Sequence, residues 1–359
     1  MGNEQFDFQD SIFKKAIKKS KNNNLVISPM SLFLPLALIS KGAKEKTLNE
    51  FLKVLNDSSN KNFYLENLNE INTILKNDKC LKITNSILSK IKLEENFIEK
   101  TKEFDILIEQ LENLDKINNL IKEKTEGKIE KIIDKIEPSS LLIILNAIYF
   151  KDDWKEEFEH SETSSKIFYL SNNQQKNVDF MNHKFSNAFY YQTESFQSIK
   201  LEYKNSDIFA TIVLPAKNIK INNFILNMNS NLFFDMSNYN SNRKNVNLFL
   251  PKIKLENFYN LNDLLKEMGL NEAFSKNANF SLLTEIKPFF IKNVFQKTCL
   301  EIYEKGTTAA SGTIVEMTLG ISSDSIEMKC ERPFLIFLSK YSLKMKKDII
   351  LLAAKIENP

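Results

Sequence analysis

The stretch EIYEKGTTAASGTIVEMTLGISSDS occupies residues 301–325, and ERPFLIFL follows it at residues 331–338. Glycine is scarce in this chain, with 7 in 359 residues, whereas roughly 7% is typical of proteins. Each glycine therefore indicates a position with a special backbone requirement. No Lys or Arg occurs between Lys305 and Lys329, although basic residues are frequent elsewhere. Three of the seven glycines also lie in this specialised segment, at Gly306, Gly312 and Gly320.

The first half of the segment has small side chains that water can solvate in a loop and that also fit between two neighbouring strands. They are Thr307, Thr308, Ala309, Ala310, Ser311 and Gly312. The next residues, Thr313, Ile314 and Val315, have a strong strand preference. Composition alone leaves two interpretations open, a plain surface loop and a loop that can join a sheet.

Outside this segment the sequence predicts an α+β domain with predominantly antiparallel or mixed sheets, because helices come first and strands follow without regular alternation. No linker divides the chain, so we expect one domain over residues 1–359. The apolar run LLIILNAIYF at residues 141–150 predicts a central strand covered on both faces. Asn146, the one amide in this run, then needs hydrogen-bond partners inside the protein.

Periodicity and punctuation give the expected elements. Helices are expected over residues 6–20, from Ser28 or Ser31 to Ser40, from a capping box at Thr47-Leu48-Asn49-Glu50, and over residues 62–76, 95–103, 114–125 and 261–268, the last stopped by Gly269. Strands are expected over residues 81–88, 104–111, 141–150, 166–171, 176–181, 196–203, 208–214, 244–256, 293–303, 333–339 and 348–356, with short helices and loops over residues 221–247.

Charge and cysteine usage argue against several classes of function. The net charge is only +3 and the basic residues are scattered, so neither nucleic acid nor a membrane is expected as a partner. Cys80, Cys299 and Cys330 are odd in number, far apart and without CxxC spacing. This pattern indicates reduced thiols, and we expect neither a metal site nor any other cofactor. Without the apolar run of a secretory signal, the expected location is cytoplasmic, with unconventional secretion as the alternative.

Several motifs in order along the chain resemble the serpin family. EIYEKGTTAASG and the later ERPFLIFL resemble its hinge, reactive loop and C-terminal strands. VISPMSLFLPLALISKGA at residues 26–43 resembles its buried strand and second helix, and LNAIYFKDDWKEEF at residues 145–158 resembles its central strand and the tryptophan beyond it. LFLPKIKLE at residues 248–256 and the final KIENP fit as well.

The resemblance covers essentially the whole chain. It implies a single domain in which helices pack on three β-sheets and a reactive-centre loop is exposed. Residues 304–332 then form the hinge and the reactive-centre loop.

The resemblance assigns a polar shutter, a buried cluster beneath the middle of the main sheet where strands must part, to Ser28, Ser31 and Asn146. The family usually places a histidine among these residues. Here the matching position in VFQKT is Gln296, which keeps hydrogen-bonding capacity but cannot titrate near neutral pH.

Trp154, the only tryptophan, matches the residue beneath the place where the loop starts to insert. Glu304 matches a hinge carboxylate that the family pairs with Lys252. The hinge itself corresponds to Glu304 and the residues Gly306, Thr307, Thr308, Ala309, Ala310, Ser311 and Gly312.

The resemblance implies a suicide-substrate inhibitor that traps a serine protease as a covalent acyl-enzyme when the cleaved loop inserts into the main sheet. The family's spacing from Glu304 puts the residue before the cut bond at Gly320, with Leu319 and Ile321 beside it and Met317 to Ser322 as the outer bounds. The absence of Lys and Arg from residues 306–328 favours chymotrypsin-, cathepsin G- or elastase-like targets over trypsin-like ones. The protein is expected to be a monomer that can also form loop–sheet polymers.

The sequence gives less support to two other classes of function. A non-inhibitory serpin-fold binding, chaperone or storage protein is the main alternative, and the small hinge side chains argue against it. An enzyme is disfavoured because the sequence lacks GxSxG, HExxH and a phosphate-binding glycine loop and contains only two histidines, His160 and His183.

Overall fold

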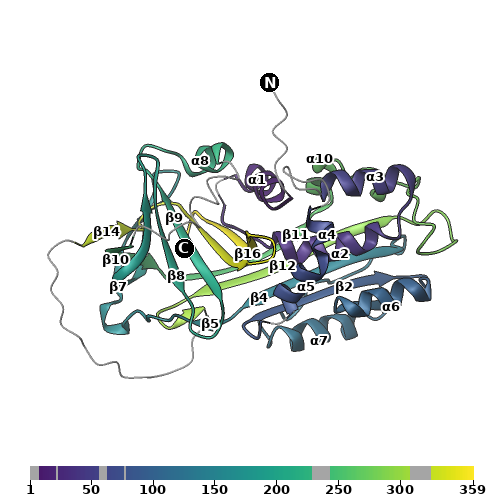
Figure 1. Cartoon of the computed structure of the whole chain (residues 1–359), viewed down its shortest axis with the longest axis horizontal. Coiled ribbons are helices and arrows are strands. Elements are labelled where there is room, and N and C mark those ends of the chain that lie inside the picture. Colours follow the sequence, from purple (N-terminus) through teal and green to yellow (C-terminus); the bar gives the residue numbers. More distant parts are fainter. Residues whose placement is uncertain (1–7, 22, 56–62, 77, 229–242, 308–324) are drawn as a thin grey trace.

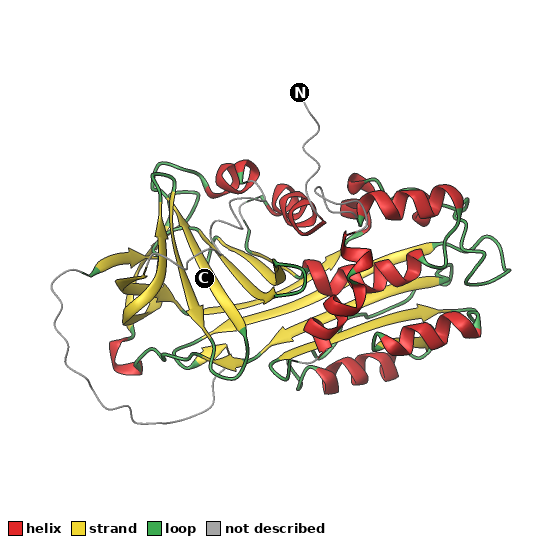
Figure 2. Cartoon of the chain, viewed as in Figure 1, coloured by secondary structure: helices red, strands yellow, loops and turns green. Residues whose placement is uncertain are grey.

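The structure is a computed structural model that describes residues 8–21, 23–55, 63–76, 78–228, 243–307 and 325–359. Within these residues the strands form sheets of nine, five and two strands. Helices lie on both faces of the five-stranded sheet, and the nine-stranded sheet continues beyond one of its ends (Figures 1 and 2). The expected α+β fold with helices packed on three sheets is confirmed.

The five-stranded sheet has a parallel pair of strands near its centre. Its order is β11 (Ile253–Asn260), β12 (Ile291–Ile302), β4 (Leu142–Phe150), β2 (Leu81–Ser89) and β3 (Ile106–Gln110). β12 and β4 run parallel, whereas β4 pairs with β2 and β12 with β11 in antiparallel fashion. Parallel pairing is slightly less stable per residue than antiparallel pairing, so the contact between β12 and β4 is the weaker kind of junction.

The central strand β4 is buried along its whole length, as its apolar run predicts. Ile148 faces the main core, to which α2 (Pro29–Ser40) belongs, whereas Tyr149 faces a second core under α7 (Leu114–Lys124). Successive side chains of a strand point to opposite faces. A continuous run of apolar residues is therefore what a strand covered on both sides requires.

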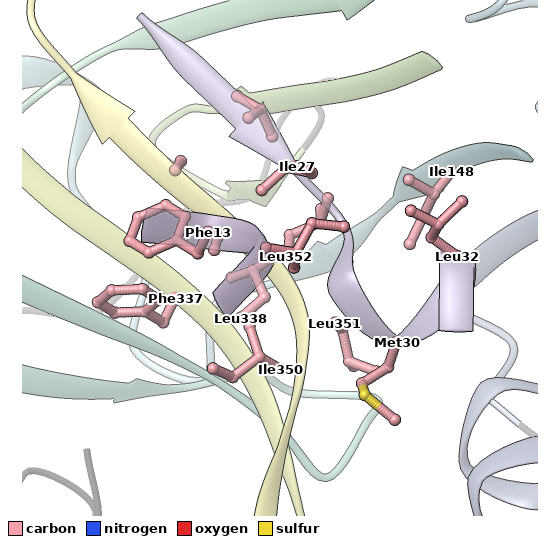
Figure 3. Close-up of a cluster of buried hydrophobic side chains, with 14 of the residues drawn as sticks. Phe13, Ile27, Met30, Leu32, Ile148, Phe337, Leu338, Ile350, Leu351 and Leu352 are labelled. Carbon is pink, nitrogen blue, oxygen red and sulfur yellow. The ribbon is translucent and has the colours of Figure 1, made fainter. Parts of the chain in front are cut away.

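The nine-stranded sheet collects most of the remaining strands. Its order is β1 (Leu25–Ile27), β16 (Lys347–Ile356), β15 (Phe334–Ser342), β9 (Ile208–Pro215), β8 (Phe196–Glu202), β7 (Gln175–Gln192), β10 (Arg243–Pro251) and β14 (Ile326–Lys329), with β6 (Ser164–Tyr169) paired to β7. Figure 3 shows the core where this sheet meets the first helices: Phe13 lies beside Phe337, with ring centroids 5.5 Å apart.

The other described elements are helices, two 3-10 turns and a small sheet. The helices are α1 (Phe8–Ser20), α3 (Glu45–Val54), α4 (Phe63–Glu66), α5 (Leu68–Lys76), α6 (Glu95–Glu103), α8 (Ile221–Asn227) and α10 (Asn262–Met268), with 3-10 turns at His160–Glu162 and Glu272–Phe274. The two-stranded sheet pairs β5 (Asp152–Asp153) with β13 (Gly306–Thr307). Gly269 adopts φ +114° directly after α10, so the expected glycine stop is confirmed.

The expected capping box at Thr47 is wrong. α3 begins two residues earlier, at Glu45. Thr47 Oγ1 instead accepts a hydrogen bond of 2.9 Å from the backbone N–H of Asn279, and Glu50 Oε2 accepts one of 2.7 Å from the N–H of Asn271. Both side chains cap a neighbouring loop, because tertiary partners compete with the helix's own N–H groups.

The single strand expected over residues 244–256 is also wrong, because the structure divides it into β10 and β11. β10 ends at Pro251 and β11 begins at Ile253, and the two strands belong to different sheets. Lys252 lies between them, with its N–H donating to Asp179 O at 2.9 Å. The apolar positions change from even numbers (Val246, Leu248, Leu250) to odd numbers (Ile253, Leu255) across Pro251, so the sequence does contain a signal for the break.

Candidate functional site

A cluster of buried polar side chains lies between β12 and β4. Gln296 on β12 stands opposite Asn146 on β4, and its Nε2 donates to Asn146 Oδ1 at 2.6 Å. The same amide group bonds the backbone of Ser28, donating to its carbonyl at 2.8 Å and accepting from its N–H at 2.9 Å. Gln296 therefore joins the two parallel strands to the residue that precedes α2.

The hydroxyl groups of Ser28 and Ser31 complete this cluster. Ser28 stands just before the helix, where Pro29 suits the first helical position because its missing N–H is not needed there. Ser31 Oγ lies 2.7 Å from Ser28 Oγ and 2.8 Å from Asn146 Oδ1. Asn146 Nδ2 donates across to Asn85 Oδ1 on β2 at 2.7 Å.

These groups satisfy one another in a region without exposed surface, since Ser28, Ser31, Asn146 and Gln296 are all fully buried. A buried polar group that loses its partner is costly. Separating β12 from β4 breaks the Gln296–Asn146 bond directly. The cluster is therefore placed where it affects how readily these two strands part.

The chain reverses direction directly after β12. Tyr303 and Gly306 exchange backbone hydrogen bonds of 2.7 and 3.1 Å, with Glu304 and Lys305 at the corner of the turn. The next residues, Gly306 and Thr307, pair antiparallel with β5, which follows β4 in sequence. Gly306 and Thr307 therefore already lie between the end of β12 and β5, the strand that continues β4.

Gly306 is required at this position by lack of space. A Cβ atom there would lie 2.1 Å from the carbonyl oxygen of Asp152 and 2.6 Å from the Cα of Asp153. Both of these atoms belong to the backbone and cannot move aside as a flexible side chain could. The scarcity of glycine in the sequence indicated a requirement of this kind, although not its cause.

Trp154 lies beneath this turn and is almost completely buried. Its indole Nε1 donates to Tyr303 O at 3.0 Å, and its backbone N–H donates to Lys305 O at 2.6 Å. Its ring stacks on Tyr203 with centroids 4.4 Å apart and an interplanar angle of 15°. Trp154 therefore supports the turn through both its backbone and its side chain.

Glu304, at the corner of the turn, is surrounded by donors. Its Oε1 lies 2.7 Å from Lys252 Nζ, 2.8 Å from His160 Nδ1 and 2.8 Å from Thr163 Oγ1. Burial alone raises the pKa of this carboxyl group, but the hydrogen bonds, above all that from Lys252, outweigh burial and lower the pKa to about 2. Glu304 is therefore ionised at neutral pH and holds the turn against two separate segments, the turn at residues 160–163 and the connection at Lys252.

Sequence reasoning missed His160 and Thr163 as partners of Glu304. They lie 144 and 141 positions away from it in the sequence, and no local motif connects them. Other expected site residues lie outside the described part of the structure: Thr308, Ala309, Ala310, Ser311, Gly312, Leu319, Gly320 and Ile321.

The three thiols do not have the environment of nucleophiles. Burial raises the pKa of Cys80 to about 12 and that of Cys299 to about 11, and it also raises the pKa of Cys330. A catalytic cysteine needs the opposite shift. Among the described residues no cluster of His, Cys, Asp and Glu could hold a metal ion, and no helix there is long and apolar enough to cross a membrane.

The family model described as "Serpin (serine protease inhibitor)" matches residues 3–359. The chain belongs to the serpin family. Among curated relatives, a serine protease inhibitor of Mus musculus is 29% identical over 98% of this chain and 87% of its own length. An uncharacterized serpin-like protein of Methanosarcina acetivorans is 31% identical over 96% of this chain and 84% of its own length.

Solved structures agree with this assignment of the serpin fold. The native-state crystal structure of tengpin, a thermophilic serpin, superimposes with a TM-score of 0.87 at 28% identity, over 98% of this chain and 92% of tengpin. Human thyroxine-binding globulin in complex with its ligand superimposes equally well, with a TM-score of 0.87, but at 23% identity its likeness concerns the fold alone.

Proposed function

We propose that this serpin is a suicide-substrate inhibitor of serine proteases that traps the acyl-enzyme by inserting its cleaved loop between β12 and β4. The observation that carries the proposal is the turn at Tyr303–Gly306 together with the pairing of Gly306 and Thr307 to β5. The chain leaves β12 in the direction that an inserting strand must take. Its first two residues already lie in line with the junction of the two parallel strands.

Insertion is favourable because it replaces one parallel pairing with two antiparallel pairings. A strand of about ten residues, at roughly 0.5–1.5 kcal/mol net per hydrogen bond, would release on the order of 10 kcal/mol. The small side chains after Gly306 in the sequence fit such a strand. The uncleaved protein is then metastable and held by a kinetic barrier.

The chemistry of trapping belongs to the protease. Its serine attacks the loop and forms an acyl-enzyme, and deacylation needs the protease's oxyanion hole a second time. Loss of a single oxyanion-hole donor slows such a step about a hundredfold to a thousandfold. Strand insertion that pulls on the attached protease and distorts this hole would therefore leave the covalent complex intact.

The sequence of the loop supports the choice of target. Leu319, Gly320 and Ile321 surround the proposed cut bond, and no Lys or Arg lies between Lys305 and Lys329. The pocket of a trypsin-like protease contains a carboxylate that requires a basic partner. We infer targets of the chymotrypsin, cathepsin G or elastase type, a monomeric inhibitor, and a hinge and reactive-centre loop over residues 304–332.

The proposal is tested by incubation with chymotrypsin, cathepsin G, elastase and trypsin, followed by denaturing gels and mass spectrometry of the released fragment. The expected result is a complex that survives denaturation, with a fragment that begins near Gly320 or Ile321. Thr307→Arg is the matched control: Thr307 is fully buried, and a charged side chain cannot enter its position without a large cost. This variant should be cleaved at the same bond without forming a complex.

Cleavage of the wild-type protein without any complex would contradict inhibition and would favour the non-inhibitory alternative. A stable complex with trypsin would overturn the assigned target class.

A further inference from the structure

The hydroxyl group of Tyr203 contacts the side chain of Thr307, the hinge residue that follows Gly306 and points into the protein. Tyr203 lies just after β8 and is buried, and its hydroxyl oxygen lies 2.9 Å from Thr307 Oγ1, within hydrogen-bonding distance. Thr307 is fully buried as well. The two hydroxyl groups therefore meet away from water.

The ring of Tyr203 is held from two sides. It stacks on Trp154, and its other contact is an edge-to-face arrangement with Phe150, with centroids 4.8 Å apart and planes at 74°. An isolated β-bridge joins Tyr203 to Trp154. An aromatic ring fixed in this way loses little further freedom when its hydroxyl group binds a partner.

A buried carboxylate fixes the backbone that follows Tyr203. Asp152 Oδ1 accepts hydrogen bonds from the N–H and the side-chain amide of Asn205, at 3.2 and 2.7 Å, and its Oδ2 accepts one of 2.6 Å from Ser206 Oγ. Asp152 is also the residue that pairs with Thr307 in the two-stranded sheet. The same strand residue therefore positions both the hinge backbone and the loop behind Tyr203.

Departure of Thr307 would leave the buried Tyr203 hydroxyl without the partner that it has in the structure. A buried polar group without a hydrogen bond is unfavourable. The contact therefore stabilises the turn with Thr307 inside.

We propose that Tyr203 is a positioning residue that captures Thr307 and thereby favours insertion of the loop over release of the protease. This inference rests on the proposed function. After cleavage, insertion of the loop competes with deacylation of the acyl-enzyme. A hinge whose first inward residue, Thr307, is already in place inserts faster, so a larger share of the protease is trapped. Tyr203 affects the ratio of trapped to released protease through Thr307 and does not contact the reacting bond.

The test compares Tyr203→Phe with Tyr190→Phe. Each substitution removes only a phenolic hydroxyl, and Tyr190 is a matched control because it is also buried and its hydroxyl donates to Gln192 Oε1 at 2.8 Å on β7. Hydrogen exchange of the amides of residues 303–307 in the uncleaved protein measures whether Thr307 remains inside. Titration of inhibitor against chymotrypsin measures how many inhibitor molecules are consumed per trapped protease.

We expect Tyr203→Phe to accelerate exchange at Gly306 and Thr307 roughly two- to tenfold, the range that the loss of one neutral hydrogen bond allows. We also expect it to consume more inhibitor per protease, whereas Tyr190→Phe changes neither quantity. Thr307→Ser should behave like the wild type and Thr307→Val like Tyr203→Phe. The double variant Tyr203→Phe/Thr307→Val should fall short of the sum of the two single effects.

Equal exchange and equal partition in Tyr203→Phe and Tyr190→Phe would overturn the inference, and so would additive effects in the double variant. Failure of the proposed function looks different, because the wild type itself would then form no complex with any of the proteases. The exchange measurement does not depend on a protease.

Discussion

The ammonium group of Lys252 lies 2.7 Å from Oε1 of Glu304, across the corner of the turn that leads from β12 into the hinge. Lys252 is also the residue at which the chain passes from the nine-stranded to the five-stranded sheet. This ion pair therefore joins the hinge to the junction of the two large sheets.

Replacement of Lys252 by Met should destabilise the native state by about 1.5–3 kcal/mol at pH 6, the usual cost of losing a charged hydrogen bond. The folded-state pKa of Glu304, about 2, lies below its ordinary value of 4.5. Its contribution to stability is thus complete above about pH 4.5 and is lost as the pH falls toward 2. The difference between wild type and variant should shrink over this window, as measured by urea unfolding at several pH values.

Lys254→Met is the control for this prediction, because Lys254 is an exposed residue on β11 whose Nζ lies 3.7 Å from Glu301. It should change stability by less than about 0.5 kcal/mol. A constant difference between wild type and Lys252→Met from pH 6 down to pH 2 would contradict the role given to Glu304.

Gly306→Ala should displace the hinge, because the new methyl group would overlap the backbone of Asp152. We expect the free energy of unfolding to fall by about 1–3 kcal/mol, the usual cost of overpacking, and the amides of residues 303–307 to exchange faster. Gly127→Ala is the control: Gly127 has φ +78°, and no atom lies within 4 Å of the place that its Cβ would occupy, so it tests backbone strain alone. Unchanged exchange at the hinge in Gly306→Ala would show that this residue has room for a side chain.

Gln296→His should make the free energy of unfolding depend on pH near neutrality. The wild-type cluster of Ser28, Ser31, Asn146 and Gln296 contains no group that titrates in this range. A histidine buried among the neutral groups of Ser28 and Asn146 has a folded-state pKa below its usual value of about 6.5. Its stability contribution is present above about pH 6.5 and is lost as the pH falls. Between pH 8 and pH 5 we expect an additional loss of stability of about 1–2 kcal/mol relative to wild type.

Gln175→His, at an exposed position at the start of β7, controls for the mere addition of a histidine. Parallel stability curves for wild type, Gln175→His and Gln296→His would contradict the view that Gln296 lies in a closed, uncharged environment.

Much of the framework could be predicted because it follows from local patterns. The apolar run at residues 141–150 became β4, and Gly269 ends α10. The pattern was less informative where a strand continued beyond its most regular part: β7 extends to Gln192, well past the expected end at residue 181. Within this extension Phe185 and Tyr190 are buried, but Ser186 and Asn187 lie between them and interrupt the alternation that predicts a strand, with Asn187 at φ +60°.

The site was only partly accessible to sequence reasoning. Ser28, Ser31, Asn146 and Gln296 lie together in the structure, and the resemblance had already grouped them. Tyr203 was not singled out at all. It meets Thr307 across 104 positions of sequence, and neither residue belongs to a motif that refers to the other, so only the tertiary fold brings the pair together.

The most direct test of the central claim is the thermal unfolding midpoint of the protein before and after cleavage of its loop. A metalloprotease that cuts before apolar residues such as Leu319 or Ile321 forms no acyl-enzyme, so every cleavage leaves free protein whose loop can insert. If the loop becomes a new strand between β12 and β4, the midpoint should rise by at least about 10 °C, while Thr307→Arg, cleaved in the same way, should show little change. An unchanged or lower midpoint in the cleaved wild type would contradict insertion and, with it, the proposed mechanism of trapping.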